Sequence, residues 1–259
     1  MDKINDEYIH KIWCFHHSLS APIYKVRKEL VLKLLPRQGE SKLCLDAGCG
    51  IGEYTLELLK RGFRVHSFDL SAYAIRRLKE QLAPMYMEKF EGLVSDILDF
   101  DSNEKYDLIL LSEVLEHVED DLDALRKMGS LLKQNGEVII TVPYDPKLWS
   151  GGDIFSRHFR RYTLEGIERI IKKSDLSIKM RWIYGFPVLR IYSLLKKRFF
   201  KSSFIKRRKE FKIGKIARIL STILNYIETV VLFFDKRCLH SKKGVGLILV
   251  CTKVQRSDK

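Results

Sequence analysis

Three glycines in one short loop constrain the fold of this chain more than any other feature. Gly48, Gly50 and Gly52 directly follow an apolar run at residues 42–47 and precede a helical pattern that begins at Glu53. Glycines let the backbone turn sharply and let a ligand come close to it. The first turn of a helix also offers free N–H groups to an anionic ligand. The loop therefore predicts a ligand site between a buried strand and a helix.

Strand and helix patterns alternate from this loop to the end of the chain. Strands are predicted near residues 42–47, 63–68, 93–94, 106–111, 137–142, 176–183 and 246–252. Helices are predicted at 7–35, 53–61, 71–81, 120–132 and 163–173. Pro22 interrupts the first helical pattern, and Asn135 with Gly136 predicts a turn. Such alternation is typical of an α/β fold with a mostly parallel sheet, whose ligands bind beyond the carboxyl ends of the strands.

Polar residues follow the predicted strands at this edge of the sheet. Asp69 ends the second strand, Asp96 follows the third, and Ser112 and Glu113 follow the fourth. An acid at the position of Asp69 can accept hydrogen bonds from the two ribose hydroxyls of a nucleoside. A dinucleotide-binding loop would need a glycine where Glu53 stands. The sequence thus favours a nucleoside-containing ligand that is not a dinucleotide.

The pattern Asp46-x-Gly48-x-Gly50-x-Gly52 resembles the first motif of class I S-adenosylmethionine-dependent methyltransferases. The resemblance covers residues 42–183 and resumes at 246. It implies a Rossmann-like, doubly wound α/β fold with a seven-stranded, mostly parallel sheet whose last strand is antiparallel. It also implies S-adenosylmethionine as cofactor, with the loop under the methionine part, Asp69 at the ribose, and Asp96 and Ile97 at the adenine. The full cofactor set is then Asp46, Gly48, Gly50, Gly52, Asp69, Leu70, Asp96, Ile97 and Ser112.

Two further segments suggest catalytic chemistry. Glu113, Glu116 and His117 follow the fourth predicted strand, and His158 lies beyond the fifth. In one interpretation His117 or His158, with Glu113 beside it, is a general base that takes a proton from a hydroxyl. In the other, all four residues bind a divalent cation (Mg, Mn or Zn) that lowers the pKa of a bound hydroxyl. This set resembles that of small-RNA 2′-O-methyltransferases and is similar to that of quinone-biosynthesis O-methyltransferases.

The same segments also have plainer interpretations. Glu113 can cap a helix, and His117 can lie against the cofactor without a metal. Arg160 and Arg161 can hold an anionic group of the substrate, or they can simply be solvated. The sequence alone leaves these alternatives open.

Charge is distributed unevenly along the chain. Residues 181–259 hold 20 of the 47 Lys and Arg but only 4 of the 33 Asp and Glu, a net charge of +16, whereas residues 1–180 carry −2. This asymmetry indicates that the basic part faces an anionic partner. It includes a predicted amphipathic helix at 216–234, whose Arg218, Asn225 and Glu228 make a membrane span costly.

A basic helical insertion therefore has three interpretations: a helix on an anionic membrane surface, a cap or dimer interface, or an RNA-binding patch. We divide the chain into an N-terminal helical segment (1–40), a methyltransferase core (41–187 and 244–259) and the basic insertion (188–243). No pair among the five cysteines has CxxC spacing, so a disulfide framework or a zinc knuckle is not expected. We expect a cytoplasmic protein, peripheral on the inner face of the membrane.

The function expected from these observations is S-adenosylmethionine-dependent O-methylation of a hydrophobic or lipid-linked metabolite, such as a quinone precursor or a glycan lipid. The alternatives are an RNA methyltransferase and a non-catalytic, S-adenosylmethionine-binding regulatory protein. The fold fixes the methyl donor and leaves the acceptor open, and the oligomeric state is not predicted.

Overall fold

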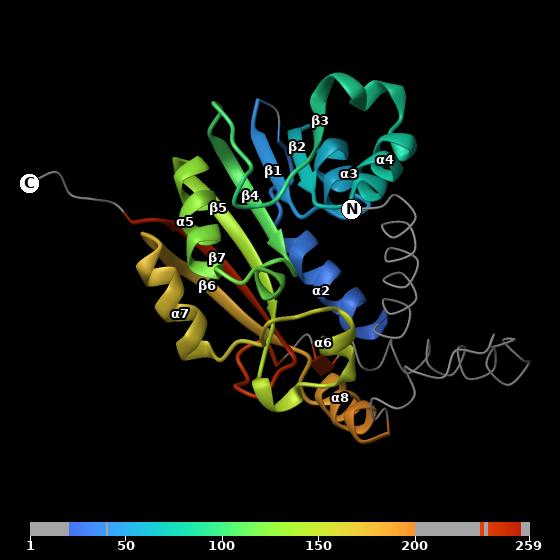
Figure 1. Cartoon of the computed structure of the whole chain (residues 1–259), viewed down its shortest axis with the longest axis vertical. Coiled ribbons are helices and arrows are strands. Elements are labelled where there is room, and N and C mark those ends of the chain that lie inside the picture. Colours follow the sequence, from blue (N-terminus) through green and yellow to red (C-terminus); the bar gives the residue numbers. More distant parts are fainter. Residues whose placement is uncertain (1–20, 40, 200–233, 236–237, 255–259) are drawn as a thin grey trace, which may run out of the picture.

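The computed structural model describes residues 21–39, 41–199, 234–235 and 238–254. These residues form a seven-stranded sheet with the strand order β3-β2-β1-β4-β5-β7-β6 (Figure 1). β7 is antiparallel to β5 and β6, and the other neighbouring strands are parallel. The predicted doubly wound α/β fold is confirmed. The strands are β1 (Leu43–Ala47), β2 (Arg64–Asp69), β3 (Phe90–Val94), β4 (Tyr106–Ser112), β5 (Leu132–Pro143), β6 (Leu176–Tyr184) and β7 (Gly246–Lys253).

Helices cover both faces of the sheet because successive strand residues point to opposite sides. On β1, Leu45 joins a core with residues of α5 and α7, whereas Cys44 joins a core with residues of α2, α3, α4 and α8. Ser71 and Thr163 cap α4 and α7 as predicted. The helices are α2 (Ala21–Leu34), α3 (Glu53–Lys60), α4 (Ala72–Gln81), α5 (Asp121–Leu131), α6 (Gly151–Phe155), α7 (Leu164–Lys173) and α8 (Val188–Phe199), with short 3-10 helices η1 (Pro84–Lys89), η2 (Leu115–His117) and η3 (Pro146–Leu148).

The turn predicted at Asn135 and Gly136 is wrong, because β5 continues through these residues. The pairing with β4 moves from Tyr106 opposite Leu132 to Leu108 opposite Glu137, so extra residues of β5 bulge out of the ladder. Asn135 and Gly136 therefore lie in an irregular part of β5 and do not form a turn between two elements.

Pro22, predicted to interrupt the first helical pattern, lies within α2 near the start of the described residues. The preceding part of the helical pattern, residues 7–20, lies outside the described residues.

α8 confirms a helix at the start of the basic insertion, and one side chain links it to the other end of that segment. The buried Asp235 accepts hydrogen bonds from the backbone N–H groups of Val188 and Leu189, both at 3.0 Å. The predicted helix at 216–234 lies outside the described residues except for Phe234. Among the helices that the structure describes, none has the length and apolar character needed to span a bilayer.

Candidate active site

A cavity of about 870 Å³ opens at the carboxyl ends of β1, β2 and β4. This is the edge at which open α/β sheets bind ligands. Seven of the nine residues predicted to bind the cofactor line it, namely Gly48, Gly50, Asp69, Leu70, Asp96, Ile97 and Ser112. The structure therefore brings together residues from four separate segments of the chain around one cavity.

The three loop glycines have positive φ angles for different purposes. A Cβ on Gly48 would lie 2.6 Å from Val114, and one on Gly52 would lie 2.1 Å from a methyl carbon of Leu78. A Cβ on Gly50 would have no atom within 4 Å. Gly48 and Gly52 thus permit close packing, while Gly50 leaves room on the cavity side.

Two of the three acids predicted for the cofactor set, Asp46 and Asp69, lie in different surroundings. Asp69 lines the cavity, and its carboxylate accepts hydrogen bonds from the backbone N–H groups of Gly50 (2.8 Å) and Ser71 (2.9 Å). Asp46 is buried beneath the loop and accepts a 2.6 Å hydrogen bond from Thr55 Oγ1. Burial raises the pKa of Asp46 to about 6. Asp46 therefore supports the loop from below, while Asp69 faces the cavity.

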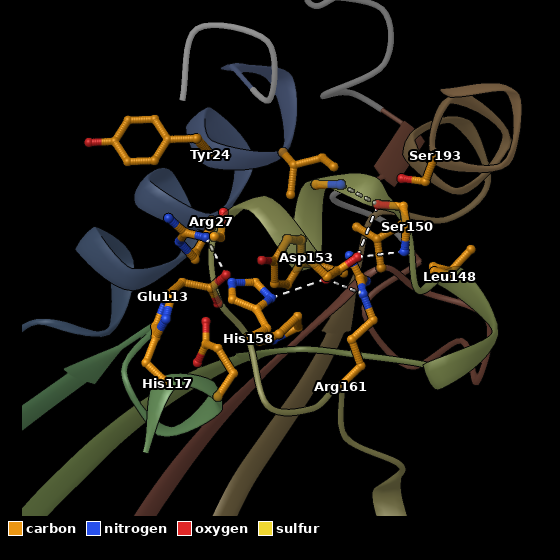
Figure 2. Close-up of a pocket in the computed structure, with 17 residues that line it drawn as sticks. Tyr24, Arg27, Glu113, His117, Leu148, Ser150, Asp153, His158, Arg161 and Ser193 are labelled. Atoms are coloured by element: carbon orange, nitrogen blue, oxygen red, sulfur yellow. Dashed lines mark hydrogen bonds and ion pairs between the residues drawn. The ribbon is translucent and has the colours of Figure 1, made fainter. Parts of the chain in front are cut away.

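A second cavity, of about 130 Å³, lies between α2, α6 and α8. Figure 2 shows its lining side chains converging from these separate helices. Glu113 and His117 line both cavities. These two side chains mark the place where a ligand in one cavity would meet a ligand in the other.

Glu113 forms an ion pair with a residue that the sequence analysis missed. Its carboxylate lies 2.8 Å from Arg27 Nη1, and its backbone N–H donates to Thr141. Burial alone would lower the pKa of Arg27, but Glu113, Tyr184 and further neighbours raise it above its ordinary value. Arg27 is far from Glu113 in the sequence, and no motif indicated the contact.

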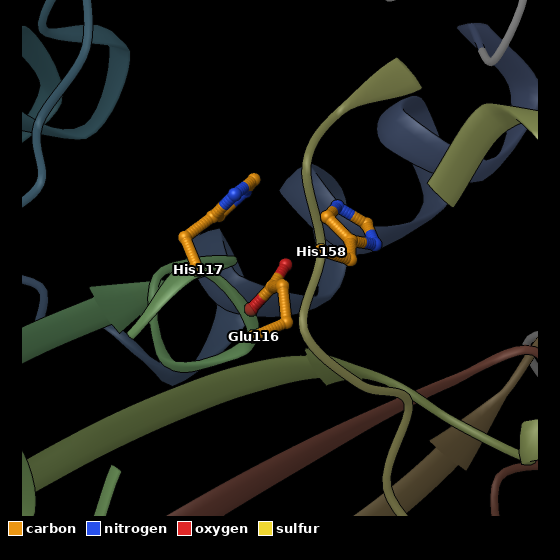
Figure 3. A group of neighbouring side chains, drawn as sticks. All are labelled: Glu116, His117 and His158. Carbon is orange, nitrogen blue, oxygen red and sulfur yellow. The ribbon is translucent and has the colours of Figure 1, made fainter. Parts of the chain in front are cut away.

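Glu116, His117 and His158 converge, with one potential ligand atom from each lying within 4.8 Å of the others (Figure 3). Of the four residues predicted to bind a cation, Glu113 is not in this group. Glu116 is fully buried, and neither of its carboxyl oxygens has a hydrogen-bond partner among the described residues. Burial and the nearby Glu113 raise the pKa of Glu116 well above its ordinary value. Burial and the nearby His158 lower the pKa of His117 to about 4, so its imidazole is uncharged at neutral pH.

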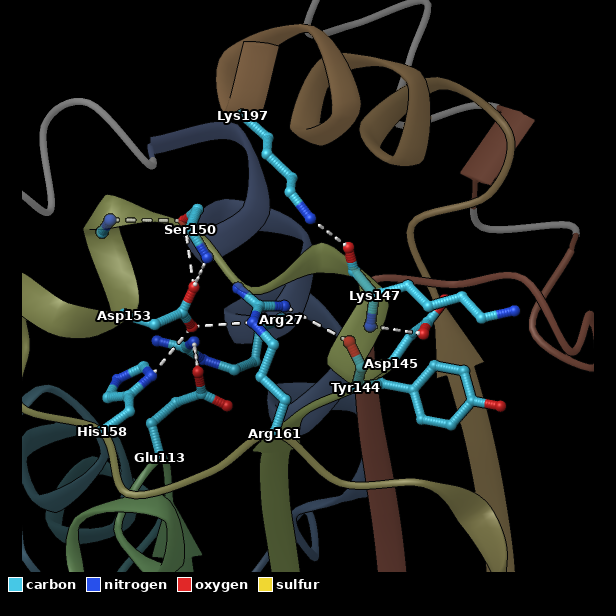
Figure 4. Close-up of polar contacts among 11 residues, drawn as sticks. Arg27, Glu113, Tyr144, Asp145, Lys147, Ser150, Asp153, His158, Arg161 and Lys197 are labelled. Atoms are coloured by element: carbon cyan, nitrogen blue, oxygen red, sulfur yellow. Dashed lines mark hydrogen bonds and ion pairs between the residues drawn. The ribbon is translucent and has the colours of Figure 1, made fainter. Parts of the chain in front are cut away.

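His158 is held by a second network, centred on Asp153 (Figure 4). Asp153 Oδ1 lies 3.1 Å from His158 Nδ1 and accepts a 2.7 Å hydrogen bond from Arg161 Nε. Asp153 Oδ2 accepts from the backbone N–H (2.8 Å) and the hydroxyl (3.0 Å) of Ser150. Although burial opposes ionisation, His158 and Arg161 hold the pKa of Asp153 well below its usual range. Asp153 was also missed, although the spacing Ser150-x-x-Asp153 resembles a capping box and signals the start of α6.

Arg160 and Arg161 are both paired within the protein. Arg160 Nη1 lies 2.7 Å from Asp121, and its Nη2 donates to the backbone carbonyl of Glu119. Arg161 pairs with Asp153 and lines the smaller cavity, whereas Arg160 lines neither cavity. Of the two, Arg161 is the one placed to meet a ligand.

Comparison with known proteins gives consistent results. Residues 17–179 match a family described as a methyltransferase domain. The ubiquinone biosynthesis O-methyltransferase of Sodalis glossinidius is 26% identical over 175 residues, covering 64% of this chain and 69% of that protein. Its namesake from Acinetobacter baumannii (strain ACICU) is 24% identical over 177 residues, covering 65% and 75%.

Solved structures resemble the whole fold at lower identity. A putative S-adenosylmethionine-dependent methyltransferase from Listeria monocytogenes has a TM-score of 0.57 at 16% identity, covering 92% of this chain and 100% of that one. The 1,6-didemethyltoxoflavin-N1-methyltransferase of Burkholderia thailandensis, solved with bound 1,6-didemethyltoxoflavin and S-adenosylhomocysteine, has a TM-score of 0.54 at 15% identity, covering 94% of this chain and 81% of that one.

Proposed function

Because this chain belongs to the methyltransferase domain family and is an S-adenosylmethionine-dependent methyltransferase, we propose that it methylates an oxygen of a hydrophobic or lipid-linked metabolite. Candidate acceptors are a quinone precursor and a glycan lipid. The observation that carries the proposal is that two cavities of different size share Glu113 and His117 as a common wall. Transfer of a methyl group requires a donor and an acceptor held in contact, and catalysis comes largely from that positioning.

The larger cavity is the proposed cofactor site. Gly50 leaves space beside the loop for the methionine part, Asp69 faces the ribose, and Asp96 with Ile97 faces the adenine. Leu70 and Ser112 complete the wall, while Asp46, Gly48 and Gly52 shape the loop. The bound cofactor supplies an activated methyl group, and these residues hold and orient it.

The smaller cavity is the proposed acceptor site. His158 is the proposed proton acceptor for the hydroxyl of the acceptor, with His117 as its uncharged neighbour. Glu113, paired with Arg27, closes the site on the side of α2. The similarity to ubiquinone biosynthesis O-methyltransferases favours oxygen as the acceptor atom.

A hydrophobic acceptor is supported by α8, which contributes Ser193 to the acceptor cavity. The same helix exposes about half of each of three apolar side chains, Ile191 (54%), Leu194 (46%) and Leu195 (51%). An apolar tail leaving the cavity would lie against this surface. We therefore propose a cytoplasmic protein bound peripherally to the inner face of an anionic membrane through its basic segment.

A second candidate for the acceptor site is a divalent cation bound by Glu116, His117 and His158. The two unpartnered oxygens of Glu116 favour it, and imidazole and carboxylate donors suit Mg, Mn or Zn to different degrees. Such a cation would lower the pKa of the acceptor hydroxyl. Loss of turnover in EDTA, with recovery on addition of one of these metals, would support the cation; full turnover in EDTA would exclude it.

The function is tested by methyl transfer from labelled S-adenosylmethionine to three acceptor classes: prenylated catechols, the same catechols without the tail, and total RNA. We expect methylation of the catechols, with kcat/KM at least about 10-fold higher for the prenylated forms. Transfer to RNA alone would replace the proposal with the RNA alternative. If the protein binds S-adenosylmethionine but transfers no methyl group to lipids, metabolites or RNA, the regulatory alternative is favoured.

A further inference from the structure

We propose that Asp153 is the positioning residue of the active site: it holds His158 in the tautomer that carries its proton on Nδ1, so that the lone pair of Nε2 faces Glu116 and His117. The proposal rests on the proposed role of His158 at the acceptor site. Asp153 itself does not act on the acceptor. It acts through the imidazole.

The geometry at Nδ1 leaves one consistent assignment of protons. Asp153 Oδ1 accepts a hydrogen bond from Arg161 Nε and lies 3.1 Å from His158 Nδ1. A carboxylate in this position can only accept, so Nδ1 must donate. In an uncharged imidazole Nε2 is then the acceptor. This nitrogen is the one left to face the group formed with Glu116 and His117.

The backbone fixes the ring between two elements. The N–H of His158 donates to the carbonyl oxygen of Asp153 at 2.9 Å, and the N–H of Phe159 donates to that of Glu116 at 2.8 Å. The imidazole of His158 therefore lies between α6 and η2, with its ring centroid 4.7 Å from that of His117. These backbone hydrogen bonds fix the position of His158 but leave its ring free to rotate. The contact with Asp153 sets the orientation of the ring.

Asp153 is itself fixed more firmly than a helix cap requires. Its side chain is 1% exposed, and Ser150 and Arg161 occupy both carboxylate oxygens. The charge of Arg161 offsets part of the cost of burying the carboxylate. The arrangement therefore fixes the orientation of the imidazole.

The test is NMR spectroscopy of protein labelled with ¹⁵N-histidine, in EDTA at about pH 8, where free histidine is uncharged. His158→Gln assigns the signal. We expect the unsubstituted protein to show Nδ1–H and an unprotonated Nε2, and Asp153→Ala to show a mixture or the reverse. Asp153→Ala should also lower kcat by about 10- to 100-fold, with the Kd for S-adenosylmethionine and the KM for the acceptor changed less than about 3-fold.

Asp235→Ala is the matched control, because Asp235 is also a buried aspartate that caps a helix. It should lower the melting temperature while leaving the His158 tautomer and kcat unchanged. If Asp153→Ala is poorly folded, Asp153→Leu replaces it, since leucine is similar in size and offers no acceptor atom to His158. An unchanged tautomer in a folded Asp153 variant, or the same loss of kcat in Asp235→Ala, overturns the proposal. Because the tautomer is measured without an acceptor, absence of methyl transfer would contradict the proposed function and leave this result standing.

Discussion

Arg27 Nη1 and the carboxylate of Glu113 lie 2.8 Å apart, and their ion pair joins α2 to the residue that follows β4. Glu113 has a left-handed backbone conformation with φ of 57°. A non-glycine residue in this region is strained and is retained where the surroundings fix it. Thr141 holds Glu113 from the neighbouring strand, and Arg27 neutralises its charge from the opposite side. The wall shared by the two cavities therefore depends on the docking of α2.

Replacing Arg27 by methionine should destabilise the protein strongly. Arg27→Met keeps much of the apolar stem but leaves the partly buried carboxylate of Glu113 with an uncompensated charge. We expect a loss of about 3–5 kcal/mol in the free energy of unfolding, measured by urea denaturation. The double variant Arg27→Met/Glu113→Gln should recover most of this loss, because it removes both charges.

The control for this prediction is an exposed ion pair. Arg64 lies 3.2 Å from Glu104, with side chains 55% and 45% exposed. Arg64→Met should therefore cost less than about 1 kcal/mol. Equal losses in Arg27→Met and Arg64→Met, or no recovery in the double variant, would show that the pair of Arg27 and Glu113 does not hold α2.

Substitutions of two loop glycines should have different effects: one should lower stability, and the other should weaken cofactor binding. Gly52→Ala places a methyl group 2.1 Å from Leu78, so we expect a lower melting temperature. Gly50→Ala meets no protein atom, and its strain at φ of 54° should cost only about 1 kcal/mol. Its methyl group would occupy cofactor space, so calorimetry should show a Kd for S-adenosylmethionine raised at least about 10-fold. Normal binding by Gly50→Ala would place the cofactor elsewhere.

The sequence predicted the fold and a common cavity for most of the proposed cofactor residues because both follow from local signals. The loop glycines, Asp69 and the apolar strands are each recognisable within a few residues, and the parallel sheet brings their ends together. Helix caps such as Ser71 and Thr163 are equally local. Short motifs and the rule that parallel strands end at one edge of the sheet thus predict most of the lining of the proposed cofactor cavity.

The contacts of the proposed acceptor site could not be predicted in the same way because they join distant segments. Nothing in the surroundings of Arg27 indicates Glu113, and the pairing of Arg161 with Asp153 depends on how α6 docks. The grouping of Glu116 with His117 and His158, without Glu113, likewise depends on the strained turn after β4. Motif spacing identified the residue types, and only the packing decides which of them meet.

Asp46 should make the stability of the protein without cofactor depend on pH. Its folded pKa of about 6 lies above the value of about 3.9 in an unfolded chain. Its contribution to stability is therefore fully present below about pH 4 and is lost as the pH rises through 6. In Asp46→Asn the amide oxygen can still accept the hydrogen bond from Thr55. The amide does not ionise, so stability is not lost as the pH rises. We expect this variant to be more stable than the original protein by about 2–3 kcal/mol at pH 8, with little difference at pH 4.

Asp107→Asn is the control, because the pKa of Asp107 is shifted in the opposite direction from that of Asp46. Although burial opposes it, the hydrogen bonds from Lys133 and from the backbone N–H of Leu43 lower the pKa of Asp107. Asp107 therefore stabilises the protein above its unfolded pKa and loses this effect as the pH falls. Urea titrations across this range should show Asp107→Asn less stable at pH 8. A pH-independent difference for Asp46→Asn would mean that Asp46 is ionised normally beneath the loop.

The exposed face of α8 should determine binding to anionic vesicles. Leu189 anchors the helix in the core and Ser193 reaches the acceptor cavity, while Leu194 and Leu195 remain about half exposed. Burying two such side chains in a bilayer contributes roughly 1 kcal/mol each. Leu194→Ser/Leu195→Ser should therefore reduce co-sedimentation with anionic vesicles by roughly 10-fold or more.

The control changes charge at a site away from this helix, in Lys172→Ser/Lys173→Ser at the end of α7. If α8 inserts apolar side chains beside basic ones, the intact protein should bind anionic vesicles and release them in high salt, and the α7 variant should bind almost as well. Equal loss in both double variants would indicate unspecific attraction by net positive charge. If the α8 variant binds vesicles as well as the intact protein does, another surface contacts the membrane. In that case α8 is a cap over the proposed acceptor cavity.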